Sequence, residues 1–367
     1  MAKIRTLSAL ALISAVALAA TGCASGAGGG SGSGGTLTYW SMWKEGEAQQ
    51  KVLASAIADF TKETGIKVTV QWQGRDSVKK VVPTLNTNNV PDLIDSSFAK
   101  LAPVLATSGQ AKELTAAYGA DVDGEKVSDL VPKAYLADAD ITREGDTAPW
   151  MLPYTLTSDA IWFNAATHPE LASAPPKDWN AFVAELDTLK AANEVPLAID
   201  GDVSGYNAYW YTSALVHIAG PGAMKKIAED KTGKAWQGAD AVEAATMVQQ
   251  LVDGGYFISG YNASKWPAQQ QAWADNKAAL LYNGTWIPTE TASYATSGFQ
   301  YSSFPFPTVD GGKKVSRADF IGFAVPAKAK NAENAQKFAS FFLSKKYQDA
   351  LGTDAKILPI RADAAIS

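Results

Sequence analysis

The segment Thr36-Leu-Thr-Tyr-Trp40 begins the folded part of the chain and decides its fold class. Its residues alternate so that Leu37 and Tyr39 lie on one face, as in a half-buried strand. Two further strand patterns follow, Ile66-Lys-Val-Thr-Val-Gln-Trp72 and Val90-Pro-Asp-Leu-Ile-Asp95. A helical pattern separates each strand from the next, and the order β-α-β-α-β predicts a parallel sheet with crossover helices. We therefore expect an α/β fold.

Helices are predicted where apolar residues recur three and four positions apart. The first is predicted at about residues 47–64 and stops at Gly65, a residue suited to a helix C-terminus. A second α/β unit is predicted farther along the chain. There, Pro175-Pro-Lys-Asp-Trp179 opens a helix, and a strand at residues 195–200 precedes a helix at about residues 208–219.

The composition excludes several classes of protein. The chain has 32 basic and 37 acidic residues, spread without long runs of one sign, and a net charge of -5. This balance gives no footprint of a nucleic-acid-binding surface and no polybasic membrane patch. About 330 residues follow Gly35, more than one core usually organises, so we expect two domains. The aromatic content stands out, with 11 tryptophans and 13 tyrosines.

The N-terminus predicts export and lipid attachment. Lys3 and Arg5 precede an apolar run too short to span a bilayer, and Ala20-Thr-Gly-Cys23 has the pattern of a bacterial lipobox. We interpret residues 1–22 as a lipoprotein signal peptide and Cys23, the single cysteine, as the lipid attachment site. Residues 23–35 then form a lipid-anchored flexible linker, because only alanine, serine and glycine follow the cysteine. The alternative is an ordinary secretory signal cut at a nearby small residue.

From Thr36 onward the chain resembles the extracellular solute-binding proteins of carbohydrate ABC transporters, the group that includes maltose-binding protein. The segments that carry the resemblance are Leu37–Trp40, Thr64–Val70, Val90–Asp95, Leu152–Tyr154, Ile161–Asn164, Pro175–Trp179, Lys277–Trp286, Phe304–Pro307 and Gly322–Pro326. They follow one another in order over almost all of the mature chain. The resemblance implies a periplasmic-binding-protein-like fold of two α/β lobes with a hinge and a central ligand cleft.

The resemblance also implies how the chain divides between the lobes. Residues 36–152 plus 298–328 are expected in lobe 1, and residues 153–297 plus 329–367 in lobe 2. Members of the family usually continue for several tens of residues past the point that matches Leu358-Pro-Ile-Arg361. We therefore expect either a short member or a second lobe that is incomplete at its C-terminus.

The chemistry of a sugar points to a particular kind of site. A sugar ring has an apolar face and a rim of hydroxyls, so its site needs flat aromatic rings beside charged or amide groups. In an open α/β sheet such a site lies at the carboxyl ends of the strands. The candidate ligand-binding residues are Trp40, Trp43, Glu47, Asp95, Tyr154, Trp210, Asn283, Trp286, Arg317 and Asp319.

The reasons for these candidates differ along the chain. Trp40 and Trp43 flank the end of the first strand. Trp286 matches a stacking position of the family and follows a turn forced by Asn283 and Gly284. Each tryptophan has plain core packing as its alternative.

The acidic candidates have alternatives of their own. Asp95 ends the third strand and is expected to point into the cleft, but it could equally cap a helix. Glu47 could be only an acidic residue in a first helical turn. Arg317 and Asp319 are either cleft residues or a surface ion pair.

Two more candidates, Tyr154 and Trp210, are expected from the second lobe, with packing as the alternative.

These features predict an extracellular receptor, lipid-anchored on the outer face of the bacterial cell membrane. It would capture a di- or oligosaccharide between two closing lobes and deliver it to the permease subunits of an ABC importer. The segments Trp40–Glu47 and Val70–Arg75 resemble branches of the family associated with xylo-oligosaccharides or other β-linked plant sugars. We expect a monomer with no cofactor, no metal, no catalytic residues and no nucleic-acid partner.

Two other classes of function remain as alternatives. A secreted lipid-anchored glycoside hydrolase would need two opposed carboxylates, and the pattern places no such pair. The chain also lacks a Gly-x-Ser-x-Gly elbow and a phosphate loop, and His168 and His217 lie far apart. An adhesin or cell-wall scaffold would need a flat exposed aromatic platform instead of a cleft.

Overall fold

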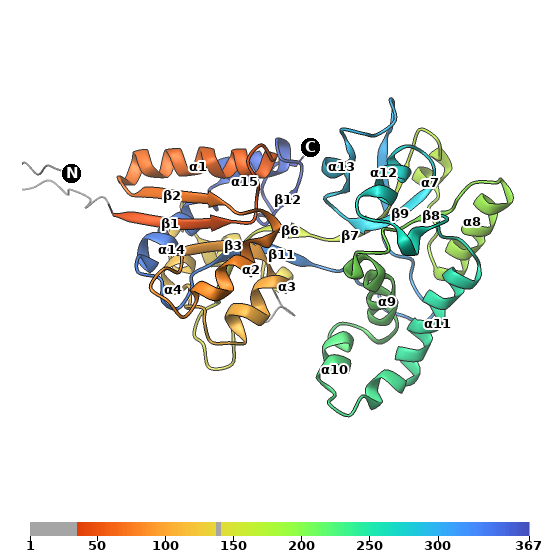
Figure 1. Ribbon diagram of the computed structural model, residues 1–367, viewed down its shortest axis with the longest axis horizontal. Coiled ribbons are helices and arrows are strands. Elements are labelled where there is room, and N and C mark those ends of the chain that lie inside the picture. The colour runs from red at the N-terminus through yellow and green to blue at the C-terminus, as the bar shows by residue number, and fades with distance from the viewer. Residues whose placement is uncertain (1–34, 137–140, 367) are drawn as a thin grey trace, which may run out of the picture. The chain divides into compact units, whose positions relative to one another are not determined.

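The computed structural model describes residues 35–136 and 141–366. They form two α/β lobes, each with its own sheet and hydrophobic core, which confirms the predicted fold class (Figure 1). The signal peptide, most of the linker and Cys23 lie outside the described residues. Within the described part of the chain, every helix is too short or too polar to cross a membrane.

The first lobe is built on a six-stranded sheet with the order β12-β6-β11-β3-β1-β2. Strand β1 lies between β3 and the edge strand β2 and pairs in parallel with both, as the β-α-β-α-β pattern predicts. The other strands join in antiparallel pairs, β11 with β3 and β6, and β12 with β6. The strands are β1 Thr36–Ser41, β2 Lys67–Trp72, β3 Leu93–Ser97, β6 Met151–Thr157, β11 Asp319–Ala324 and β12 Leu358–Pro359, with the separate hairpin β4 Asp121–Val122 and β5 Glu125–Lys126.

Helix α1 shows why this lobe folds as the sequence predicts. Its apolar residues recur at helical spacing, so that Val52, Ala56 and Phe60 are all buried on one face. The helix ends at Gly65, which has the left-handed φ of 71° that a glycine adopts without strain. The helices of this lobe are α1 Ala48–Thr64, α2 Ser77–Val81, α3 Phe98–Leu101, α4 Thr115–Tyr118, α5 Val127–Leu130, α6 Lys133–Leu136, α14 Ala332–Phe341 and α15 Lys345–Thr353, with short turns at Gly74–Asp76, Val82–Thr84 and Ala102–Ala106.

The C-terminal helices correct the predicted division of the chain. Residues 329–367 were expected in lobe 2, yet α14, α15 and β12 belong to the first lobe. Phe338 of α14 packs its ring 5.3 Å from that of Phe60 in α1, and Leu351 of α15 lies in the same core. An amphipathic helix can cover any sheet, so the pattern alone does not say which core it joins.

The second lobe is built on a four-stranded sheet with the order β10-β7-β9-β8. Strand β10 pairs with β7, which corrects the expectation that residues 298–328 lie wholly in lobe 1. The strands are β7 Asp159–Asn164, β8 Leu197–Ala198, β9 Leu280–Gly284 and β10 Tyr301–Phe304. The helices are α7 Pro169–Ser173, α8 Trp179–Ala191, α9 Ser204–Ala219, α10 Ala223–Glu229, α11 Ala239–Asp253, α12 Ala268–Ala274 and α13 Ile287–Thr291, with turns at Lys234–Gln237 and Tyr261–Ala263.

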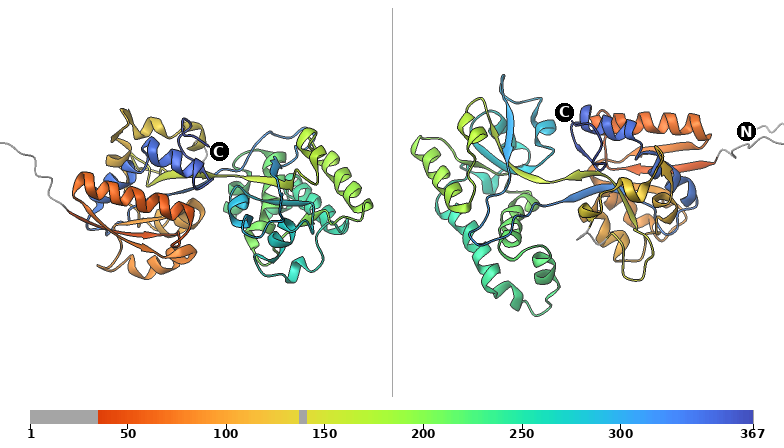
Figure 2. Two further views of the ribbon diagram at one scale, coloured as in Figure 1. Left: turned by 90° about the horizontal axis from the view of Figure 1, so that it is seen from above. Right: turned by 180° about the vertical axis from the view of Figure 1, so that it is seen from behind.

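Two chain segments connect the lobes, and they lie side by side in both views of Figure 2. Strand β6 of the first sheet leads into β7 of the second through Ser158 alone. The chain returns through residues 305–318 to β11, which pairs with β6. The Ser158 hydroxyl donates to the carbonyl of Arg317 at 2.7 Å, so a hydrogen bond ties the two connections together. The boundary of the first lobe thus lies near Ser158 and not at residue 152, because β6 remains in the first sheet up to Thr157.

Candidate functional site

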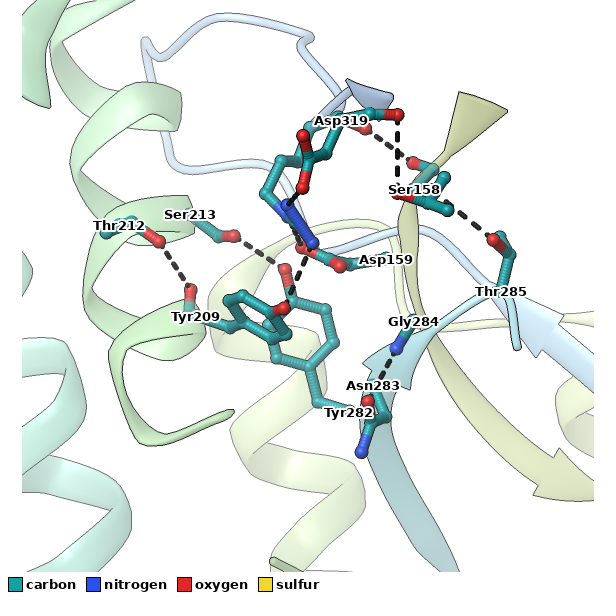
Figure 3. Close-up of polar contacts among 12 residues, drawn as sticks. Ser158, Asp159, Tyr209, Thr212, Ser213, Tyr282, Asn283, Gly284, Thr285 and Asp319 are labelled. Atoms are coloured by element: carbon teal, nitrogen blue, oxygen red, sulfur yellow. Dashed lines mark hydrogen bonds and ion pairs between the residues drawn. The ribbon is translucent and has the colours of Figure 1, made fainter. Parts of the chain in front are cut away.

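A cluster of polar side chains lies where the two connections meet (Figure 3). The Nε of Arg317 donates to Oδ2 of Asp159 at 2.7 Å, and its Nη2 donates to the Tyr209 hydroxyl at 3.1 Å. The guanidinium also lies 4.4 Å from the centroid of the Tyr209 ring. Asp319 completes the cluster, with Oδ2 at 3.7 Å from Nη1 of Arg317. One guanidinium therefore organises two carboxylates and an aromatic ring.

The carboxylates of this cluster are held in an unusual environment. Burial raises the pKa of Asp159 and of Asp319 above the ordinary value, and the charge of Arg317 opposes the shift in both. The Oδ1 atom of Asp159 is buried and has no hydrogen-bond partner among the described residues. The Tyr282 hydroxyl pairs with Ser213 at 2.5 Å and also lies close enough to Asp159 to lower the pKa of that carboxyl.

An aromatic wall adjoins this cluster. The rings of Tyr206 and Trp286 stack with centroids 6.4 Å apart, and Tyr206 contacts Tyr209 at 5.9 Å. All three side chains are partly exposed. Tyr206 and Tyr209 lie three residues apart on α9, so they share one face of that helix. We call these three residues the aromatic wall.

Gly284 allows Trp286 to take its place in the wall. A Cβ atom built on Gly284 would lie 2.1 Å from a carbon of the Trp286 ring, far inside contact distance. The indole therefore lies directly against the backbone at the end of β9. The sequence Asn283-Gly-Thr-Trp286 thus sets the position of the ring as well as the turn.

A second polar group lies beside the wall on α12 and α13. Gln270 donates from Nε2 to Oε2 of Glu290 at 3.4 Å and accepts from the Trp266 indole at 3.2 Å. Burial raises the pKa of Glu290, which the hydrogen bond from Gln270 and the charge of Arg75 in the first lobe oppose. Glu290 and Gln270 therefore offer acceptor and donor groups next to the rings.

The first lobe contributes an ion pair at the carboxyl ends of β1 and β2. Arg75 contacts Glu47 with 2.9 Å between Nη2 and Oε1, and both side chains are partly exposed. The guanidinium also lies 4.8 Å from the ring centroid of Trp43 and donates to the carbonyl of Met42 at 3.0 Å. This edge is where ligands bind in open α/β sheets.

Three predicted site residues that lie in the first lobe are buried and have other partners. Trp43 is buried, and its Nε1 donates to the Tyr154 hydroxyl at 2.8 Å. Asp95 is fully buried and accepts hydrogen bonds from Tyr39, Ser41, Met42 and Tyr154, so its carboxylate does not point into an open cleft as expected. Burial raises its pKa, against the effect of these hydrogen bonds. Tyr154 is equally buried and lies in β6 of the first lobe, which corrects its expected place in the second.

Three other predicted residues have mainly structural contacts. Trp210 is buried in the core of the second lobe against Tyr282, with ring centroids 4.8 Å apart. Asn283 is buried, and its Oδ1 accepts from the backbone N–H of Gly284 at 2.8 Å. Trp40 is partly buried and packs against the core of the first lobe.

Tyr206 and Tyr209 therefore link Trp286 of the second lobe to Arg317 of the return connection, which contacts Asp319 at the start of β11 in the first sheet. In the first lobe, Arg75 contacts both Trp43 and Glu47. Sequence reasoning missed Tyr206, Tyr209, Asp159, Glu290, Gln270 and Arg75. For the two tyrosines a signal existed, because the three-residue spacing places them on one helix face. The remaining four carry no distinguishing local pattern.

The arrangement suits a neutral ligand with apolar ring faces and many hydroxyls. Aromatic faces supply stacking, and the carboxylate, amide and guanidinium groups supply directional hydrogen bonds. In residues 35–136 and 141–366, no group of three or more His, Cys, Asp or Glu side chains is placed to hold a metal ion.

Comparison with known proteins identifies a family and relatives that this chain resembles. The sequence model of the family described as "Bacterial extracellular solute-binding protein" matches residues 43–349. The "Multiple sugar-binding protein" of Streptococcus mutans serotype c is 24% identical over 343 residues, which cover 89% of this chain and 76% of that protein.

Two solved structures share the fold. One comes from work on xylan utilization by the thermophilic bacterium Caldanaerobius polysaccharolyticus, with a TM-score of 0.72, 18% identity and coverage of 89% of this chain and 82% of that one. The other is the bacterial solute receptor AcbH, with a TM-score of 0.72, 19% identity and coverage of 90% and 82%. Since the family match spans most of the sequence, this chain belongs to the bacterial extracellular solute-binding proteins.

Proposed function

We propose that this protein is the sugar-binding receptor of an ABC importer and that it captures a di- or oligosaccharide between its two lobes. The observation that carries the proposal is the aromatic wall of Tyr206, Tyr209 and Trp286, set against the cluster of Arg317 and Asp159. Rings and hydrogen-bonding groups of this kind are what a sugar requires from its site.

The proposed mechanism is capture without chemistry. The apolar face of a sugar ring stacks on the wall, and its hydroxyls donate to Glu290 and accept from Arg317, which the buried carboxylate of Asp159 holds in place. A ligand that also contacts Arg75 and Glu47 of the first lobe binds the closed arrangement best and shifts the population toward it. The family is one of solute-binding proteins, so a glycoside hydrolase gains no support from it.

The names of similar proteins favour a sugar as the solute. The Streptococcus mutans protein is called a multiple sugar-binding protein, one solved structure comes from xylan utilization, and AcbH is described with a preference for β-D-galactopyranose. Several aromatic rings in one wall suit more than one sugar ring. We therefore infer an oligosaccharide, with xylo-oligosaccharides or another β-linked plant sugar as the first class to test.

The same proposal includes the membrane partners. Cys23 would carry the lipid that holds the receptor at the outer face of the cell membrane, and permease subunits would accept the loaded receptor. The lipobox pattern Ala20-Thr-Gly-Cys23 supports the anchor, and the family supports a role outside the cytoplasm.

Intrinsic tryptophan fluorescence of the purified protein tests the proposal. The protein is titrated with xylobiose, cellobiose, maltose and their monosaccharides, and the same samples are assayed for hydrolysis products. A saturable change with one class of disaccharide and no products supports the receptor and identifies its ligand. Product formation, or no response to any of these sugars and their longer oligomers, contradicts it.

A further inference from the structure

Asp95 lies beneath the carboxyl edge of the first sheet and is surrounded by donors. Its Oδ2 accepts from the hydroxyls of Tyr154 at 2.6 Å and Tyr39 at 2.8 Å. The Ser41 hydroxyl donates to the same atom at 3.2 Å, and the backbone N–H of Met42 donates to Oδ1 at 2.7 Å. Each of these bonds holds its donor in place, because breaking it would leave a buried polar group unpaired.

Two routes of contact lead from this buried carboxylate to the surface. Along the backbone, Met42 donates its N–H to Asp95 and accepts from Nη1 of Arg75 with its carbonyl at 3.0 Å. Through side chains, the Tyr154 hydroxyl donates to Asp95 and accepts from Nε1 of Trp43 at 2.8 Å. The Trp43 ring in turn lies under the guanidinium of Arg75, at 4.8 Å. Both routes end at the same arginine.

Arg75 needs such support if it is to bind a ligand well. Its side chain is 41% exposed, and its partner Glu47 is 30% exposed. Glu47 holds the guanidinium on one side through two contacts, from Nη2 to Oε1 at 2.9 Å and from Nη1 to Oε2 at 3.0 Å. The carbonyl of Met42 and the ring of Trp43 hold it on another side, so the buried groups beneath the arginine share in setting its position.

We propose that Asp95 is a positioning residue of the sugar site and that it acts on Arg75 and not on the ligand. The groups between them, Met42, Tyr154 and Trp43, transmit the fixed geometry of the carboxylate to the guanidinium, which donates to sugar hydroxyls. A pre-positioned arginine strengthens binding because little side-chain freedom is lost when the sugar arrives. This inference rests on the proposed function.

Two tyrosines that donate to the same carboxylate oxygen provide a matched test. Tyr154→Phe removes the hydroxyl that joins Asp95 to Trp43, whereas Tyr39→Phe removes a hydroxyl outside both routes. Each variant loses one buried hydroxyl, and Tyr154→Phe also leaves the indole N–H of Trp43 without its acceptor, so it should lose more stability than Tyr39→Phe. We expect about tenfold weaker sugar binding for Tyr154→Phe and a change within about twofold for Tyr39→Phe.

A double-mutant cycle separates positioning from general damage to the fold. In protein that carries Arg75→Gln, the guanidinium is absent and Tyr154→Phe should weaken binding no further. Full additivity of the two substitutions would overturn the proposal, because Tyr154 would then act independently of Arg75.

A second pair of variants tests Asp95 itself against a carboxylate on the same strand segment. Asp92 is also buried and accepts from Thr38 and Asn331, but at the opposite end of β3 from the site. Asp95→Asn should weaken sugar binding about tenfold, and Asp92→Asn should leave it within about twofold, even where both lower stability.

The outcomes distinguish this inference from the function on which it rests. If the unsubstituted protein binds no sugar, the proposed function fails and this inference with it. If it binds sugar but both members of either variant pair weaken binding equally, or neither weakens it, the proposed function stands and the positioning role is overturned.

Discussion

The guanidinium of Arg317 lies 4.4 Å from the ring centroid of Tyr209 while its Nε donates to Asp159 at 2.7 Å. Arg317 belongs to the segment that returns to the first sheet, and Tyr209 lies on α9 of the second lobe. The contact therefore joins the return connection to the aromatic wall. Any change in Arg317 should affect both the stability of this junction and the placement of a ligand-binding ring.

Replacing Arg317 with methionine should destabilise the protein by about 2–4 kcal/mol, because the nearly inaccessible carboxylate of Asp159 loses its partner. The free energy of unfolding from urea denaturation measures this loss. Arg317→Met combined with Asp159→Asn should regain part of it, because the uncompensated charge is gone. A single Arg317→Met variant as stable as the unsubstituted protein would show that the pair contributes nothing.

Replacing Trp286 with alanine should weaken sugar binding at least about tenfold, because the ligand loses both stacking and apolar contact. Trp236→Ala is the control. Trp236 is 45% exposed and stacks on Tyr211 with ring centroids 5.9 Å apart, and Tyr211 is a residue of α9 outside the aromatic wall. Titration by calorimetry measures both. Equal losses for the two variants would argue against the aromatic wall as the ligand site.

His217 gives the stability of the second lobe a pH dependence of definite sign. The ring is buried against Phe306, and burial lowers its pKa below the ordinary value of 6.5, partly offset by a hydrogen bond to the carbonyl of Ser213. The unfolded chain therefore takes up a proton near pH 6.5 while the folded protein does not. The free energy of unfolding should fall as pH decreases through 6.5 toward the folded-state pKa.

The matched variant for this effect is His217→Leu. Between about pH 7 and pH 5, the free energy of unfolding of this variant should depend less on pH than that of the unsubstituted protein. At the steepest point the two slopes should differ by up to ~1.4 kcal/mol per pH unit. Urea denaturation at several pH values measures both proteins. Identical pH profiles would exclude His217 as the cause.

The fold could be predicted largely because its opening segments are local. Strand β1, helix α1 and strand β2 each show their period in fewer than twenty residues, and their order fixes a parallel pairing. The assignment of α14 to a lobe could not be predicted in this way. Its buried face fits a sheet of either lobe, and tertiary packing decides the matter, with Phe338 against Phe60, Tyr39 and Phe323 of the first lobe.

The candidate site shows the same limit at the level of single residues. Trp210 was predicted from its residue type, but the buried side of α9 runs through Trp210, Ser213, Ala214 and His217. The neighbouring Tyr209 faces the polar cluster instead. Both faces of this helix are rich in aromatic residues, so residue type does not tell which face is buried. Tertiary packing decides it, since Trp210 lies against Phe182, Tyr282 and Phe306.

Replacing Gly284 with alanine should move the Trp286 ring without breaking the fold. The added Cβ would lie 2.1 Å from the ring, and the ring is the outer part of a side chain that can rotate away. Sugar binding should weaken about tenfold, and the free energy of unfolding should fall by only about 1–2 kcal/mol. Gly254→Ala is the matched control, because its Cβ would lie 2.3 Å from the ring of Tyr256 in the same lobe but outside the aromatic wall. Sugar titration and urea denaturation of both variants measure the two effects. Unchanged sugar binding by Gly284→Ala, with the intrinsic fluorescence of the protein altered, would mean that the position of this indole does not matter for the ligand.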